Sequence, residues 1–155
     1  MIFNALTIFH VALSLVGIGS GFVVVYGLLK SKYFSGWTSL FLVTTVATSV
    51  TGFLFPFHQF LPSHGVGILS LIVLAIAMLA LYRYRLEGGW RRTFAITAVI
   101  ALYFNFFVLI AQLFLKVPAL HDLAPTQSEP PFQIAQLVAL VLFVVLGVRA
   151  ATKFK

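Results

Sequence analysis

Five long apolar stretches dominate the sequence and decide what the chain can fold into. They cover about residues 5–29, 37–57, 65–81, 93–115 and 132–148. Each is close to the roughly 20 helical residues that cross the hydrocarbon core of a bilayer. Hydrophobic residues make up 61% of the chain and charged residues only 8%, too little polar surface for a soluble globule. We therefore predict an all-α integral membrane protein, with residues 1–155 forming a single domain of five transmembrane helices.

The basic residues predict the orientation of these helices. Nine of the ten fall in or beside connections that five crossings place on one side: Lys30, Lys32, Arg83, Arg85, Arg91, Arg92, Arg149, Lys153 and Lys155. Only Lys116 falls on the other side. Cytoplasmic loops of membrane proteins are enriched in Lys and Arg. We therefore predict a protein of a bacterial inner membrane, with its N-terminus outside and its C-terminus in the cytoplasm. A re-entrant stretch at residues 55–64 would split the first two basic clusters between the two sides, so we reject it.

Composition and motifs exclude several functions. The chain has no Cys, so thiolate metal ligands, Fe–S clusters and nucleophilic thiols are excluded, and any metal must be bound by N and O ligands. Membrane topology explains the net charge of +7, and we expect no nucleic-acid partner. There is no P-loop, no Gly-x-Ser-x-Gly and no His-Glu-x-x-His motif. The Gly17-Ile-Gly-Ser-Gly21 stretch lies within the first apolar run, where its glycines favour helix packing.

Polar residues form rows along the predicted helices. In the first helix, polar and small residues recur at spacings of three and four, at Thr7, His10, Ser14, Gly17 and Gly21. The second helix repeats this pattern at Thr44, Thr48, Thr51, Phe55 and His58, with Pro56 expected to bend its end. Shorter rows follow at Thr97, Asn105 and Gln112 and at Gln133 and Gln136. Such rows share one helix face, which is predicted to point inward. The alternative for the hydroxyls is a hydrogen bond to their own helix backbone.

All four histidines lie toward the predicted outer end of the helices: His10, His58, His64 and His121. Asp122 and Glu129 lie in the connection at the same end. Neutral imidazoles with one or two carboxylates suit Cu, Zn and nonhaem Fe. The sequence therefore predicts a transition-metal site near the outer, periplasmic face, with electron transfer or other redox chemistry as its role. His10, His58 and His64 are the predicted ligands, and His121, Asp122 and Glu129 complete or cover the site.

Alternatives to this metal site stay open. Haem b would need two imidazoles from different segments, His10 with His58 or His64. Singly, the interfacial histidines can be solvated without any ligand, and His10 can be a neutral imidazole bonded to a Thr or Gln on a neighbouring helix. Glu129 can simply begin the last helix behind a Ser128 cap.

Two further functions differ in class. One is a cofactor-free accessory or scaffold subunit, packed against partner membrane proteins or a second copy. The other is a quinone- or lipid-directed membrane enzyme that uses His and Asp as acid and base. The sequence does not decide between these functions, nor whether the protein is an enzyme.

Overall fold

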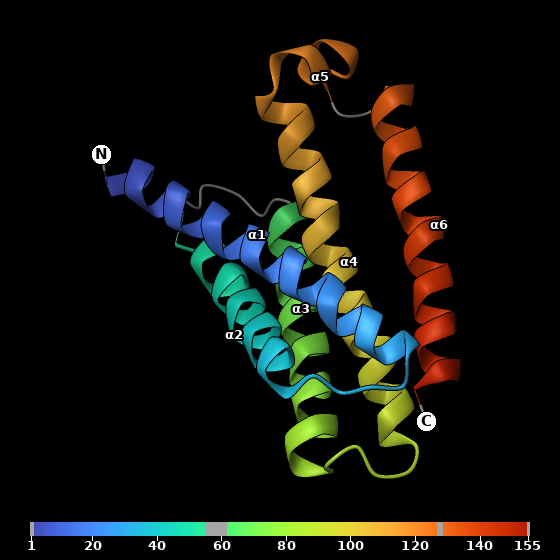
Figure 1. Cartoon of the computed structure of the whole chain (residues 1–155). Helices are drawn as coiled ribbons and strands as arrows, with labels where there is room; N and C mark the ends of the chain where they lie inside the picture. Colours follow the sequence, from blue (N-terminus) through green and yellow to red (C-terminus); the bar gives the residue numbers. More distant parts are fainter. Residues whose placement is uncertain (1, 55–61, 127–128, 155) are drawn as a thin grey trace.

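The protein is an all-helical membrane bundle in the part of the chain that the computed structural model describes, residues 2–54, 62–126 and 129–154. Side chains are placed at residues 5–54, 65–114, 117–126 and 129–154. The long helices are α1 (Ile2–Leu29), α2 (Ser35–Gly52), α3 (Pro62–Met78), α4 (Trp90–Lys116) and α6 (Pro130–Lys153). A π-helical turn, η1 (Leu79–Arg83), extends α3, and the short α5 (Pro118–Leu123) follows α4. Figure 1 shows α1 and α2 crossing the bundle obliquely, beside the more upright α3, α4 and α6.

Four helices in the described residues are long and apolar enough to cross a membrane: Ala5–Leu29, Gly65–Arg83, Trp90–Phe114 and Pro130–Lys153. The chain is therefore a multi-pass membrane protein. Large apolar side chains are exposed along the helices, most densely on α6, as expected for lipid contact. A fifth crossing by α2, the sidedness of the termini and packing against partner subunits remain predictions.

Helix α2 differs from the other long helices in its polarity. Five of its 18 residues are threonines, which lowers its hydropathy, but Thr38, Thr44 and Thr45 are buried inside the bundle. Thr44 Oγ1 donates a hydrogen bond to Leu40 O at 2.7 Å, so its hydroxyl is satisfied by its own helix. The polarity of α2 thus lies largely on a face turned toward protein.

The predicted helix bounds are close to the observed ones, except at the end of α2 and at the end of α6, which continues past the predicted residue 148 to Lys153. Helix α2 was expected to continue to Phe57, but it ends at Gly52. The Phe53 N–H bonds to Val50 O at 3.1 Å, a tighter i to i−3 bond that closes the last turn. Phe55 and the bend expected at Pro56 lie outside the described residues.

Helix α1 crosses α2 and α4 closely through two glycines. A Cβ atom at Gly21 would lie 2.6 Å from Leu102 Cδ1 and 3.0 Å from the Phe41 ring. A Cβ atom at Gly17 would lie 3.1 Å from both Thr45 Oγ1 and Asn105 Nδ2. At both positions a larger side chain would have to displace these neighbours, so the glycines favour the close approach that small residues commonly allow in membrane bundles. The inward orientation predicted for this face of the first helix is confirmed.

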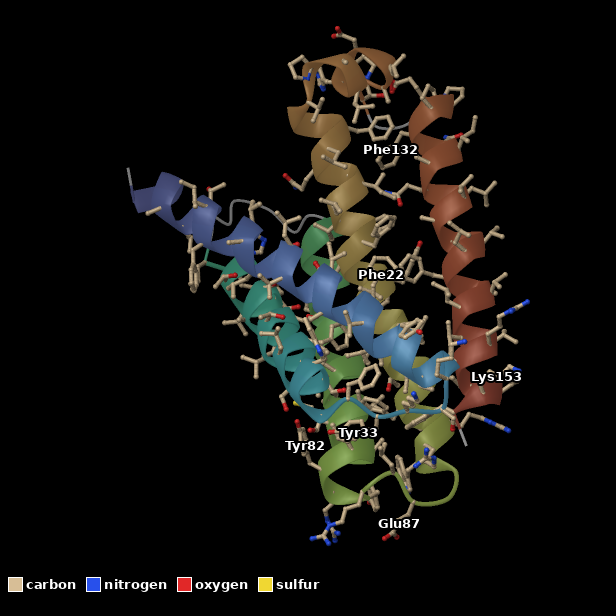
Figure 2. The ribbon with its side chains drawn as sticks, viewed as in Figure 1. Phe22, Tyr33, Tyr82, Glu87, Phe132 and Lys153 are labelled. Carbon is tan, nitrogen blue, oxygen red and sulfur yellow. The ribbon has the colours of Figure 1, made fainter. Side chains whose placement is uncertain are left out.

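The basic connections meet at one end of the bundle. The Arg91 guanidinium lies 4.1 Å from the centroid of the Phe154 ring, which joins the start of α4 to the end of α6. Tyr33 precedes α2, and its pKa is raised by burial and then by the nearby Tyr82 of η1. Figure 2 shows Tyr33, Tyr82, Glu87 and Lys153 toward this end and Phe132 at the opposite end. We refer to the end of the bundle that carries Arg91 and Lys153 as the basic end.

The glycine crossing gives a first prediction. Gly21→Leu should lower the free energy of unfolding by about 1–3 kcal/mol, because the added side chain overpacks the contact with Phe41 and Leu102. Gly19→Leu is the matched control, since a Cβ there meets nothing within 4 Å, and it should change stability by no more than about 0.5 kcal/mol. Unfolding in mixed detergent micelles measures both. Equal losses would show that the crossing does not depend on Gly21.

Candidate functional site

A cavity of about 540 Å³ lies between the N-terminal half of α1, the C-terminal half of α2, the start of α3 and the C-terminal half of α4. Its volume falls within the range of about 300–1,000 Å³ that is typical of small-molecule sites. All four helices contribute polar side chains to its wall: Thr7, His10, Ser14, Thr45, Thr48, Ser49, Ser70, Asn105 and Gln112. We call this space the polar cavity.

The rest of the polar cavity is apolar, and none of the described residues that line it is Asp, Glu, Lys or Arg. Phe53 and Phe104 contribute aromatic rings. Val11, Leu15 and Leu113 line the cavity and are 42%, 52% and 40% exposed, so this part of its rim faces outward from the bundle, where lipid lies. An uncharged wall with scattered hydrogen-bonding groups suits a neutral ligand with an apolar body, because a charge would be buried without a partner.

The His10 imidazole is held by a hydroxyl on the neighbouring helix. His10 Nδ1 lies 2.7 Å from Thr51 Oγ1, and Thr51 Oγ1 in turn lies 2.8 Å from Ala47 O. A hydroxyl carries one proton, and Thr51 directs it to that carbonyl. With that proton directed to Ala47 O, the Thr51 oxygen accepts a hydrogen bond from Nδ1–H of His10, which favours the Nδ1–H tautomer of the neutral ring. In that tautomer Nε2 is the ring atom with acceptor and metal-ligand character.

Two further polar contacts in the cavity wall join different helices. Ser14 Oγ on α1 donates to Asn105 Oδ1 on α4 at 3.0 Å, and Asn105 is only 7% exposed. Ser49 Oγ on α2 lies 3.4 Å from Ser70 Oγ on α3. Hydroxyl and amide groups are therefore present on two walls of the cavity, one formed by α1 and α4 and the other by α2 and α3.

The rows of polar residues predicted from the sequence include much of this cavity wall. Thr7, His10 and Ser14 of the predicted first row line the cavity, as do Thr48, Asn105 and Gln112 from the others. Thr97 instead bonds to Thr93 O in its own helix at 2.8 Å, which is the alternative expected for hydroxyls. Gln136 donates to Phe107 O at 3.2 Å and does not line the cavity.

Sequence reasoning missed Ser49 and Ser70. Ser49 follows Thr45 by four residues on α2, so a second hydroxyl row runs beside the one that was recognised. Ser70 lies in the middle of the otherwise apolar third stretch. Its position as a single polar residue among apolar ones was the sequence signal that could have identified it. It is 5% exposed.

The predicted three-histidine ligand set of His10, His58 and His64 remains a prediction. His58 lies outside the described residues, and His64 lies in the first turn of α3 with a side chain that is not described. Among the side chains that the structure does place, no three His, Asp or Glu residues come together as a metal-ion site.

The residues expected to cover the site lie on and after α5. His121 is half-buried on α5, and the neighbouring Asp122 is exposed. Glu129 is the N-cap of α6, whereas the sequence placed it one position later, behind a Ser128 cap. Its carboxylate accepts hydrogen bonds from the backbone N–H and the hydroxyl of Thr126, so it orders the chain that enters α6.

The chain was compared with protein-family models, with curated proteins and with solved structures. No family model matches it, and neither the curated proteins nor the solved structures give a match. The chemistry of the cavity itself is therefore the basis for a functional assignment.

The Thr51 contact gives a second prediction. In the wild-type protein, ¹⁵N NMR of labelled histidine at neutral pH should show His10 protonated on Nδ1. Thr51→Val removes the acceptor of that proton and should shift the tautomer toward Nε2–H. Thr48→Val is the control, because Thr48 bonds to its own backbone at Thr44 O. An unchanged His10 tautomer in Thr51→Val would show that another group sets it.

Proposed function

We propose that this protein binds a neutral, membrane-soluble molecule with a hydrogen-bonding head group, of the quinol and quinone type, in the polar cavity. His10 is the proposed polar anchor. The observation that carries the proposal is a cavity whose described lining residues are uncharged and largely apolar, and to which four helices each bring hydroxyl, amide or imidazole groups. This is the pattern of a small-molecule site that fixes orientation with few polar contacts.

The two polar walls favour a ring with oxygens at opposite edges. Ser14 and Asn105 can bind one edge and Ser49 and Ser70 the other, while Phe53 and Phe104 offer aromatic surface to the ring. The Nε2 lone pair of His10 suits a hydroxyl donor, so a quinol hydroxyl complements it directly. The lipid-facing rim at Leu15 and Leu113 would admit such a molecule laterally.

Binding of a short-chain benzoquinol to the protein in nanodiscs tests the proposal. We expect saturable binding with one ligand per chain, and His10→Ala should weaken it at least tenfold, about 1.4 kcal/mol, because the ligand hydroxyl loses its acceptor. His121→Ala is the matched control, since His121 does not line the cavity, and its affinity should stay within twofold of wild type. Absence of saturable binding by the wild-type protein would reject the proposal, as would equal losses in the two variants.

A second candidate is the transition-metal or haem b site with His10 among its ligands. The hydrogen bond from His10 Nδ1 to Thr51 Oγ1 favours it, because metal-bound histidines characteristically donate their other ring N–H to a protein oxygen. His58 and His64 are the proposed further ligands, with His121, Asp122 and Glu129 covering the site.

Elemental analysis and the absorption spectrum of the purified protein test this second candidate. Copper, zinc, iron or haem should be stoichiometric, and His10→Ala should lower its occupancy at least tenfold. Occupancy should fall as the pH drops below about 6, because binding needs neutral imidazoles. A colourless, metal-free protein that still binds the quinol would decide against it.

A further inference from the structure

We infer that a second cavity, between α4 and α6, binds one anionic phospholipid, with an acyl chain between the two helices and its phosphate at Arg92. This cavity has a volume of about 550 Å³. Arg92 and Thr152 lie at one end of its lining, Val99 and Gly147 in the middle, and Tyr103 and Phe143 toward the other end. We call it the α4–α6 groove. It shares no lining residue with the polar cavity, so the inference does not depend on the proposed function.

The length of the groove matches one leaflet of a bilayer. Arg92 and Tyr103 are eleven residues apart on α4, which is about 17 Å of helix axis at about 1.5 Å per residue. Half of a hydrocarbon core of about 30 Å is about 15 Å. The groove therefore extends from the basic end to about the middle of the membrane, which is the reach of a single acyl chain.

The groove is bordered on α6 by Gly147, which has no side chain to fill it. A Cβ at Gly147 would lie 3.6 Å from Val99 Cγ1, an ordinary van der Waals contact, and the Val99 side chain is only 2% exposed. The rings of Tyr103 and Phe143, with centroids 5.6 Å apart, join the two helices at the deep end. The lining is apolar between these rings and the basic end, which suits an acyl chain.

Charge favours a phosphate at the open end. Arg92 is exposed and lines the groove, whereas its neighbour Arg91 lies over the Phe154 ring. Lys153 adds charge at the same end (Figure 2), and Arg149 precedes it by one helical turn. None of the described residues that line the groove carries a carboxylate. Basic groups beside an interhelical apolar groove are a recognised arrangement for anionic lipid head groups, and a guanidinium binds phosphate oxygens in a bidentate manner.

Lipid binding to the purified, delipidated protein in an uncharged detergent tests this inference. Native mass spectrometry would compare phosphatidylglycerol with phosphatidylcholine of the same acyl chains. We expect the wild-type protein to retain phosphatidylglycerol at least fivefold more tightly. Arg92→Gln should reduce this preference to below twofold without lowering stability, because the side chain is exposed.

Two further variants make the test specific. Arg85→Gln is the matched charge control, because Arg85 is exposed near the same end but does not line the groove, and it should keep the preference. Gly147→Leu should fill the groove and weaken both lipids. No preference in the wild-type protein would overturn the inference, and so would equal effects of Arg92→Gln and Arg85→Gln. A dimer that retains no lipid and that Gly147→Leu dissociates would also overturn it, in favour of a second copy in the groove.

Discussion

The structure depends on one constraint, which is that a bilayer offers polar groups no water to bond with. Hydroxyl, amide and imidazole groups in the helices must therefore find partners within the protein. Thr44 and Thr97 bond to their own helices, whereas Ser14 and Asn105 bond to each other across two helices. The second solution needs close approach, and glycine at position 17 provides it. In the centre of this bundle, the polar pair therefore forms where the helices pack closely.

The same constraint explains why the oblique crossing of α1 leaves a cavity rather than a closed core. Near Gly17 and Gly21 the helices are in tight contact. Toward its N-terminus, the same face of α1 carries Thr7, His10 and Ser14, which line open space. His10 remains well placed there because Thr51 binds its Nδ1–H. Such a hydrogen bond lowers the free-energy cost of placing a polar ring in the cavity wall.

The two cavities differ in the chemistry that they offer. The polar cavity combines neutral hydrogen-bonding groups from four helices, while the α4–α6 groove is apolar along its length with an arginine at its open end. Neutral amides and hydroxyls can orient a ligand head group, whereas a single terminal cation with an apolar tract fits a lipid. One bundle therefore contains two cavities of different chemistry, one lined by neutral hydrogen-bonding groups and one apolar with a basic end.

Sequence by itself determined the membrane class, the approximate helix bounds and the inward face of α1, because apolar length and helical spacing are local properties of the chain. It also identified His10 as an intramembrane polar group. Only the tertiary structure decided that Thr51 is a partner of His10, that Ser49 lies beside Ser70, and that Gly147 lies opposite Val99. These depend on how helices far apart in sequence cross, and spacing within one helix carries no information about the angle or register of its neighbour.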